Sequence, residues 1–162
     1  MPRLLPLALL VFLAPAAPVL SGCDGQQAGT CPEIGTFQLE DITPAEVALG
    51  DASASGGSCV TVDYVGRLAD GSGVFEEGRK TLAVITGRGE TAGLILGING
   101  LRVNQTRRVT VPARLGYGGF PRAALADTSD RGTPLVGIPA CSVLEYDVTL
   151  VRVNQDTRLC GL

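Results

Sequence analysis

The chain contains no histidine and no tryptophan, and its aromatic side chains are three tyrosines and four phenylalanines. The lack of histidine excludes Ser-His-Asp and Cys-His catalysis, in which an imidazole activates the nucleophile. A bound metal such as zinc is not expected, because the cysteines are far apart and no histidine completes a ligand set. No Cys-x-x-Cys pair occurs, so a thioredoxin-like redox function is not expected either.

Positive charge is also scarce. The formal net charge is −3, and Arg3 is the only charged residue among the first 22, so residues 23–162 carry −3 − 1 = −4. Lys80 is the only lysine. An acidic chain with scattered arginines has no electrostatic basis for binding nucleic acid, and we expect no nucleic acid partner.

The N-terminus resembles an export signal. Arg3 supplies a positive start, and residues 4–20 carry no charge. This stretch is interrupted by prolines and is short for a membrane-spanning helix. It ends in Leu20-Ser21-Gly22-Cys23, which looks like a bacterial lipobox, so we expect Cys23 to be lipidated. The alternative is an ordinary signal peptide that ends near a cysteine.

The predicted organisation is therefore a lipoprotein signal at 1–22, a lipid-anchor cysteine with a tether at 23–35, and a single domain at 36–162. The lipid would hold the protein on a membrane at the extracytoplasmic side of a bacterial cell envelope. An even number of further cysteines in an exported chain predicts two disulfides. These cysteines are Cys31, Cys59, Cys141 and Cys160.

Alternation of apolar and polar residues predicts β-strands. The predicted strands are 36–42, one beginning near Val60, 81–86, 108–111 and 143–153. One short helix is predicted at 97–104, with Ile98 and Leu101 on the same face. A few strands with one helix and no internal repeat predict an α+β domain with an antiparallel sheet.

Six short motifs follow one another along residues 58–153. They are Val62-Asp63-Tyr64-Val65-Gly66, Phe75-Glu76, Leu94-Ile95-Leu96-Gly97, Gly116-Tyr117-Gly118, Ile138-Pro139 and Tyr146 in the last strand. Their order and spacing resemble the FK506-binding-protein (FKBP) type of peptidyl-prolyl cis-trans isomerase. The resemblance implies a five-stranded antiparallel half-barrel sheet curled around one short helix, with a prolyl pocket between them.

The resemblance also implies roles for particular residues. The Tyr117 hydroxyl and the Ile95 main-chain N–H would donate to a substrate carbonyl, and Glu76 stands where the family usually has aspartate. The substrate-binding wall would consist of Tyr64, Phe75, Leu94, Ile98, Ile138 and Tyr146. A monomer without a cofactor is expected. From the pattern alone, Tyr64 and Tyr146 are equally compatible with ordinary core tyrosines.

The implied topology suggests how the cysteines pair. The strand that begins after Cys59 would run antiparallel to the last strand, which brings its start near Cys160. The N-terminal strand would lie one strand away from the last and parallel to it, which brings Cys31 toward Cys141. We therefore expect the disulfides Cys31–Cys141 and Cys59–Cys160.

Three departures from the family pattern concern the pocket. Ile98 stands where tryptophan is common, Glu76 replaces aspartate, and the loop at 119–137 is longer than in the smallest members. Two functions stay open. The first is a peptidyl-prolyl isomerase that assists the folding of exported, proline-containing polypeptides while bound to the membrane by its lipid. The second is a non-catalytic module that binds proline-containing segments.

Overall fold

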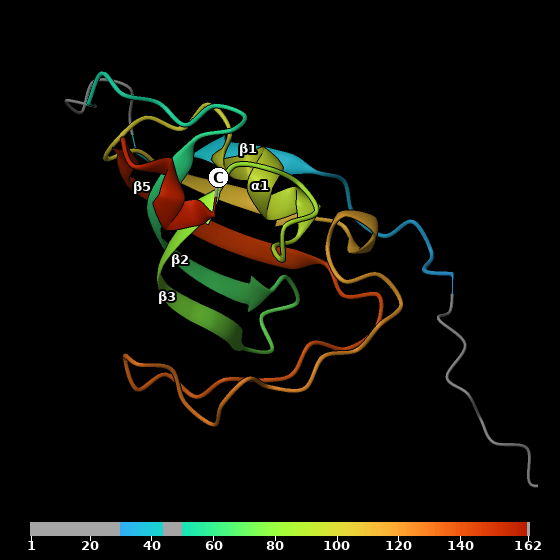
Figure 1. The fold of residues 1–162 in the computed structure, drawn as a ribbon. Coiled ribbons are helices and arrows are strands. Elements are labelled where there is room, and N and C mark those ends of the chain that lie inside the picture. The colour runs from blue at the N-terminus through green and yellow to red at the C-terminus, as the bar shows by residue number, and fades with distance from the viewer. Residues whose placement is uncertain (1–29, 44–49, 162) are drawn as a thin grey trace, which may run out of the picture.

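The computed structural model describes residues 30–43 and 50–161 (Figure 1). The predicted export signal and the predicted lipidation of Cys23 lie outside these residues and stay predictions. The strands are β1 (Gln38–Asp41), β2 (Cys59–Leu68), β3 (Val74–Ala83), β4 (Thr106–Val111) and β5 (Leu144–Asn154). The helices are α1 (Ala92–Ile98) and two short 3₁₀ turns, η1 (Ala113–Leu115) and η2 (Thr157–Cys160).

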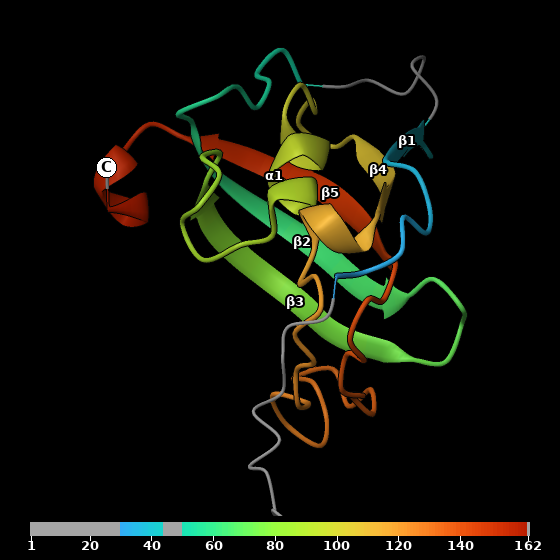
Figure 2. The same cartoon turned by 90° about the vertical axis from the view of Figure 1, so that its right-hand side faces the viewer.

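All strand pairs in the sheet are antiparallel, in the order β1-β4-β5-β2-β3. The helix α1 lies across one face of this open sheet, over β4 and β5 (Figure 2). The predicted five-stranded antiparallel sheet with one short helix is therefore confirmed. Alternate side chains of β2 and β5 face the helix, and Val60, Val62 and Leu150 are completely buried there. Burial of these apolar side chains is the main force that holds the helix on the sheet.

The third strand differs from its prediction at 81–86. It begins at Val74, ends at Ala83, and pairs with β2 along its whole length, with a register shift between Gly66 and Arg67. Its first half is rich in charged residues and therefore lacks the apolar alternation on which the prediction relied. Pairing with β2 satisfies the backbone of this half, which local composition does not reveal.

The helix also differs from its prediction at 97–104. It begins after Thr91, whose hydroxyl accepts a hydrogen bond from the Leu94 N–H at 3.4 Å, and it ends at Ile98. Gly93 and Gly97 face the sheet, and a Cβ atom on either would overlap the side chain of Val111 or Val109. The glycines that lower helix propensity are thus what lets α1 approach β4 closely.

Two disulfides join the ends of the fold. They are Cys31–Cys141 and Cys59–Cys160, with Cα–Cα distances of 5.3 Å and 5.7 Å, so the expected pairing is confirmed. The first attaches the segment before β1 to the loop before β5, and the second attaches η2 to the start of β2. Within the described residues, no helix has both the length and the apolar character needed to cross a membrane.

Candidate functional site

A cavity of about 450 Å³ opens beside the start of β3. Its lining combines residues from β3, from the turn after η1, and from the loop at 119–137. The lining residues are Phe75, Glu76, Gly89, Tyr117, Arg122, Ala123, Ala124, Leu125, Val136 and Ile138. Four of the residues singled out by the sequence meet here, namely Phe75, Glu76, Tyr117 and Ile138.

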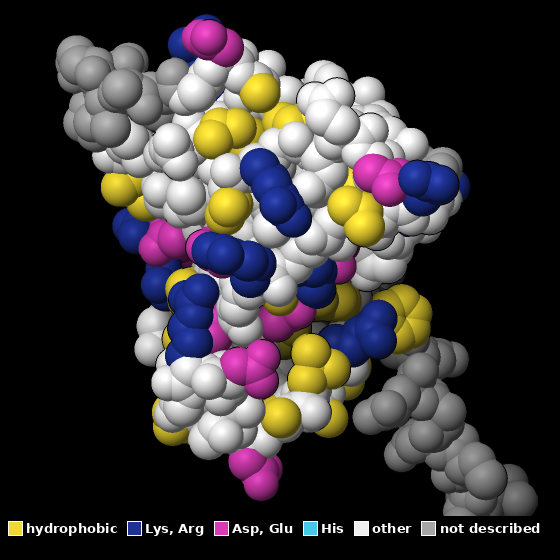
Figure 3. Space-filling model, turned by 60° about the vertical axis from the view of Figure 1, so that its left-hand side comes forward, with side chains coloured by type: hydrophobic (Ala, Val, Ile, Leu, Met, Phe, Trp, Pro, Cys, Tyr) yellow, Lys and Arg dark blue, Asp and Glu magenta, His cyan; other side chains and the backbone are white. Residues whose placement is uncertain are grey.

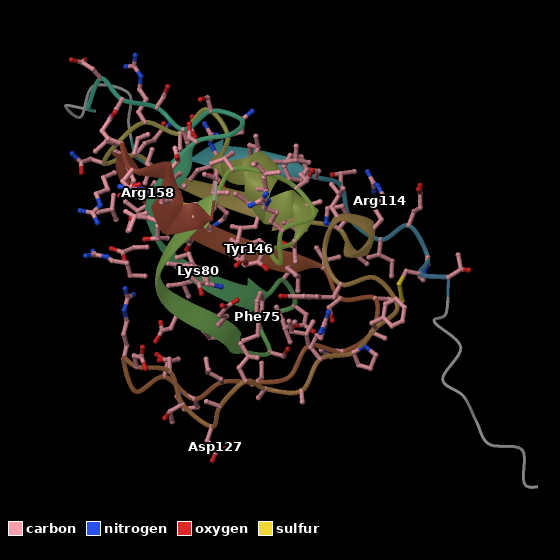
Figure 4. The ribbon with its side chains drawn as sticks, viewed as in Figure 1. Phe75, Lys80, Arg114, Asp127, Tyr146 and Arg158 are labelled. Carbon is pink, nitrogen blue, oxygen red and sulfur yellow. A yellow bond between two sulfur atoms is a disulfide. The ribbon has the colours of Figure 1, made fainter. Side chains whose placement is uncertain are left out.

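Phe75 lines the cavity, and the Tyr146 ring packs against it from the core. Phe75 and Tyr146, both labelled in Figure 4, meet edge to face with their ring centroids 5.5 Å apart. Both side chains are buried. Gly66 on β2 leaves room for them, because a Cβ at this position would lie 2.7 Å from Phe75 Cζ and 3.0 Å from Tyr146 Cε1. The glycine of the Tyr64-Val65-Gly66 motif is therefore needed for the packing of the wall.

A hydrogen-bonded cluster of polar and charged side chains includes the lining residue Glu76. The Tyr64 hydroxyl donates to Glu76 Oε1 at 2.5 Å, and Lys80 Nζ donates to the same oxygen at 2.9 Å and to Glu90 Oε1 at 3.0 Å. Lys80 Nζ also lies 5.4 Å from the centre of the Tyr64 ring. Tyr64 is thus a core tyrosine whose hydroxyl is satisfied, and Glu76 is held by two donors.

The pKa values agree with this arrangement. Burial, followed by the hydrogen bond to Glu76, raises the pKa of Tyr64 well above its ordinary value, so the phenol stays protonated. Burial alone lowers the pKa of Lys80, but the hydrogen bonds to Glu76 and Glu90 outweigh this effect and raise it. Lys80 therefore stays charged between its two carboxylates.

The Tyr117 hydroxyl has a different environment. Tyr117 follows η1, is half-buried, and lines the cavity. No other group in the described residues forms a hydrogen bond with its hydroxyl. Burial, and then the charges of Glu76 and Glu90, raise its pKa, so the group is a donor at neutral pH. Because Tyr117 lines the cavity, this donor is available to a ligand carbonyl.

The helix residues lie deeper than expected. Leu94, Ile95 and Ile98 are buried in the core, and none of them lines the cavity. The Ile95 N–H donates to the Thr91 carbonyl at 3.2 Å, because α1 begins at Ala92 and Thr91 caps it. Its expected role as a donor to substrate stays a prediction.

The sequence motifs did not identify Thr91 as a residue near the site. It is buried and precedes the helix, and its hydroxyl accepts a hydrogen bond from the Leu94 N–H. Burial strongly raises the pKa of the Tyr146 phenol, and a hydrogen bond with Thr91 opposes this shift. A threonine just before an apolar run is a typical helix N-cap, and this signal places the helix start at Thr91.

The loop at 119–137 forms the outer wall. Arg122 and Ile138 exchange two main-chain hydrogen bonds of 2.8 Å, and the Val136 N–H donates to the Val74 carbonyl at 2.9 Å. The Ser129 hydroxyl donates to Glu77 Oε1 at 2.5 Å. The loop is therefore attached to the pocket wall at one end and to β3 along its course, and it borders the cavity without filling it. The sequence marks this loop as longer than in the smallest family members but assigns none of its residues to the pocket.

Comparison with known proteins gives a consistent result. The family described as FKBP-type peptidyl-prolyl cis-trans isomerase matches residues 50–151. FK506-binding protein 4 of Chaetomium thermophilum is 31% identical over 127 residues, which are 76% of this chain and 23% of that protein. FK506-binding protein 3 of Candida albicans is 35% identical over 106 residues, which are 64% of this chain and 22% of that protein. The chain thus spans about a quarter of the length of these relatives.

A solved structure supports the fold. A peptidyl-prolyl cis-trans isomerase from Pseudomonas syringae pv. tomato superposes with a TM-score of 0.52 and 20% identity, over 74% of this chain and 76% of that one. At this identity the likeness concerns the path of the backbone, not the chemistry of the site.

Proposed function

The chain belongs to the FKBP-type peptidyl-prolyl cis-trans isomerase family, and we propose that it catalyses rotation about X-Pro bonds in exported polypeptides. The observation that carries this proposal is the Tyr117 hydroxyl, an unoccupied and protonated donor on the wall of an apolar cavity. A substrate proline ring would pack against Phe75 and Ile138. Its preceding carbonyl would accept a hydrogen bond from Tyr117.

The chemistry needs neither a nucleophile nor a base. Resonance holds an X-Pro amide planar, with a barrier to rotation of about 18–20 kcal/mol. The twisted amide has lost most of this charge separation, so it is less stabilised by water than the planar amide. An apolar cavity therefore favours the twisted state relative to water, and a donor fixes the carbonyl while the proline side rotates. The lack of histidine does not affect this mechanism.

Glu76 acts indirectly in this scheme. Its carboxylate accepts hydrogen bonds from Tyr64 and Lys80, which fixes the position of the Tyr64 hydroxyl. The charge of Glu76 is compensated at the edge of the cavity and is not directed at the amide. The longer side chain in place of aspartate is accommodated because Lys80 supplies a second partner.

The cell envelope is the proposed location, and Cys23 is the proposed site of lipidation. Two observations support this. The motif Leu20-Ser21-Gly22-Cys23 follows an uncharged stretch. The domain also contains two disulfides, which persist in oxidising compartments. A Cys23→Ser variant should leave the membrane fraction of a bacterial host, and one that stays there would contradict the anchor.

Isomerase activity is tested by two-dimensional exchange NMR on a short Leu-Pro peptide with the oxidised full-length protein. Exchange should be faster than the uncatalysed process, which takes about 10–100 s. Tyr117→Phe removes only the donor and should lower kcat/KM by about tenfold, equivalent to one hydrogen bond of roughly 1–1.5 kcal/mol. Unchanged kcat/KM would remove Tyr117 from the mechanism. Peptide binding without any acceleration would instead favour the non-catalytic module that binds proline-containing segments.

A further inference from the structure

The outer wall of the cavity contains a cation that the proposed isomerase chemistry does not use. Arg122 lines the cavity and lies with its guanidinium carbon 5.0 Å from the centre of the Tyr117 ring. It is exposed, and in the part of the chain that the structure describes it forms no ion pair. We infer that Arg122 selects prolyl segments that carry an acidic side chain beside the proline. This inference rests on the proposed function and names the class of substrate.

The position of Arg122 is set by its backbone. Its N–H and C=O both pair with Ile138, which is itself a wall residue. Gly137 permits this close approach, because a Cβ there would lie 2.8 Å from the Arg122 carbonyl oxygen. The side chain then stacks on the ring whose hydroxyl is the proposed donor. Arg122 is therefore held next to the place where the substrate carbonyl would bind.

The charges around the cavity leave Arg122 as the available cation. Lys80 is already paired with both Glu76 and Glu90. The loop also contains Asp127, but its side chain lies at the far end of the loop and points away from the cavity (Figure 4). A carboxylate brought in by a substrate would consequently find its partner in Arg122.

The remaining lining residues of the loop indicate what accompanies the acidic residue. Ala123, Ala124 and Leu125 continue from Arg122 along the mouth, and the Leu125 side chain is 79% exposed. They form an apolar surface next to a single positive charge. This surface suits a segment in which an apolar residue precedes proline and an acidic residue lies one position before that residue or directly after proline.

The inference is tested with two series of blocked peptides. In acetyl-Ala-Xaa-Leu-Pro-Phe-Ala-amide and acetyl-Ala-Leu-Pro-Xaa-Phe-amide, Xaa is Glu, Gln or Lys. We measure kcat/KM by exchange NMR and Kd by isothermal titration. In at least one series, the Glu peptide should exceed the Gln peptide by about three- to fivefold, which is the range of an exposed ion pair, and the Lys peptide should be lowest. About 0.5 M salt should reduce this preference because it screens the pair.

Variants assign the preference to one side chain. Arg122→Gln should reduce the ratio of the Glu value to the Gln value to about one, whatever its effect on both peptides together, and Arg122→Glu should favour the Lys peptide. Arg114→Gln is the matched control, because Arg114 is an exposed arginine on η1 that lines a separate cavity (Figure 4). Since Arg122 is exposed and pairs through its main chain, these changes should not prevent folding.

The outcomes separate this inference from the proposed function. Equal values for Glu and Gln peptides in both series, or a preference that persists in Arg122→Gln, would overturn the inference while leaving isomerase activity intact. If no peptide is isomerised, the proposed function fails, but the order of Kd values still decides whether Arg122 selects acidic segments.

Discussion

The aromatic wall of the cavity depends on one glycine. Gly66→Ala would place a Cβ 2.7 Å from Phe75 Cζ and 2.8 Å from Phe75 Cε2, closer than carbon atoms approach in folded proteins. The Phe75 ring is buried and packs edge to face on Tyr146, so it cannot move without disturbing its neighbour. The substitution should therefore strain the wall and push Phe75 toward the cavity.

The magnitude follows from two opposing effects. Overpacking of a buried site costs about 1–3 kcal/mol. Replacing glycine within a strand recovers about 0.5–1 kcal/mol of conformational entropy. We expect Gly66→Ala to lower the free energy of unfolding by about 1–2 kcal/mol, which corresponds to a Tm lower by roughly 4–8 °C. Because the ring moves into the binding site, KM for Leu-Pro peptides should rise.

Urea unfolding and exchange NMR measure both effects. Gly56→Ala is the matched control, since a Cβ at Gly56 meets nothing within 4 Å, and its stability should be unchanged or slightly higher. Adding Phe75→Leu to Gly66→Ala removes the ring that clashes, so the pair of substitutions should cost less than the sum of the single ones. A Gly66→Ala protein with unchanged stability and unchanged KM would refute this account of the wall.

Two further predictions concern the fold. The disulfide Cys59–Cys160 joins residues 101 positions apart in the chain. The double substitution Cys59→Ala and Cys160→Ala should lower the free energy of unfolding, measured by urea titration, by about 2–5 kcal/mol. A loss under about 1 kcal/mol would contradict this prediction. On β5, hydrogen bonding from Arg108, against the effect of burial and with help from Arg67, holds the pKa of Asp147 below its usual range. A carboxyl whose pKa is lowered by folding stabilises the protein above its unfolded pKa, near 3.8, and this stability is lost as the pH falls through the lower folded value. Asp147→Asn should therefore be less stable at pH 7 and should lose less stability on acidification below about pH 4, and equal losses in the two proteins would contradict the assignment.

Pairing of opposite charges extends over the surface. Asp147 bridges Arg108 and Arg67 across three strands, and Asp63 pairs with Arg79. Figure 3 shows acidic and basic side chains beside one another on one face of the molecule.

The sequence alone predicted the elements whose side chains alternate in hydrophobicity. Buried and partly buried residues alternate over 62–68 in β2 and over 144–151 in β5, and the prediction of these strands needed no tertiary information. The family motifs added the topology, and from the topology the pairing of the cysteines. Phe75, Glu76, Tyr117 and Ile138 were likewise named in advance and lie together at the cavity.

The tertiary structure decided the rest, for identifiable reasons. Gly93 and Gly97 oppose helix formation locally, but the close contact with Val111 and Val109 stabilises α1 where propensity would not place it. The earlier start of the helix in turn places the Ile95 N–H in a hydrogen bond with the Thr91 carbonyl. Arg122 reaches the cavity only because its backbone pairs with Ile138, sixteen positions away in the chain. Local pattern determines which segments can become strands, whereas contacts between distant segments determine which donors and charges face the substrate.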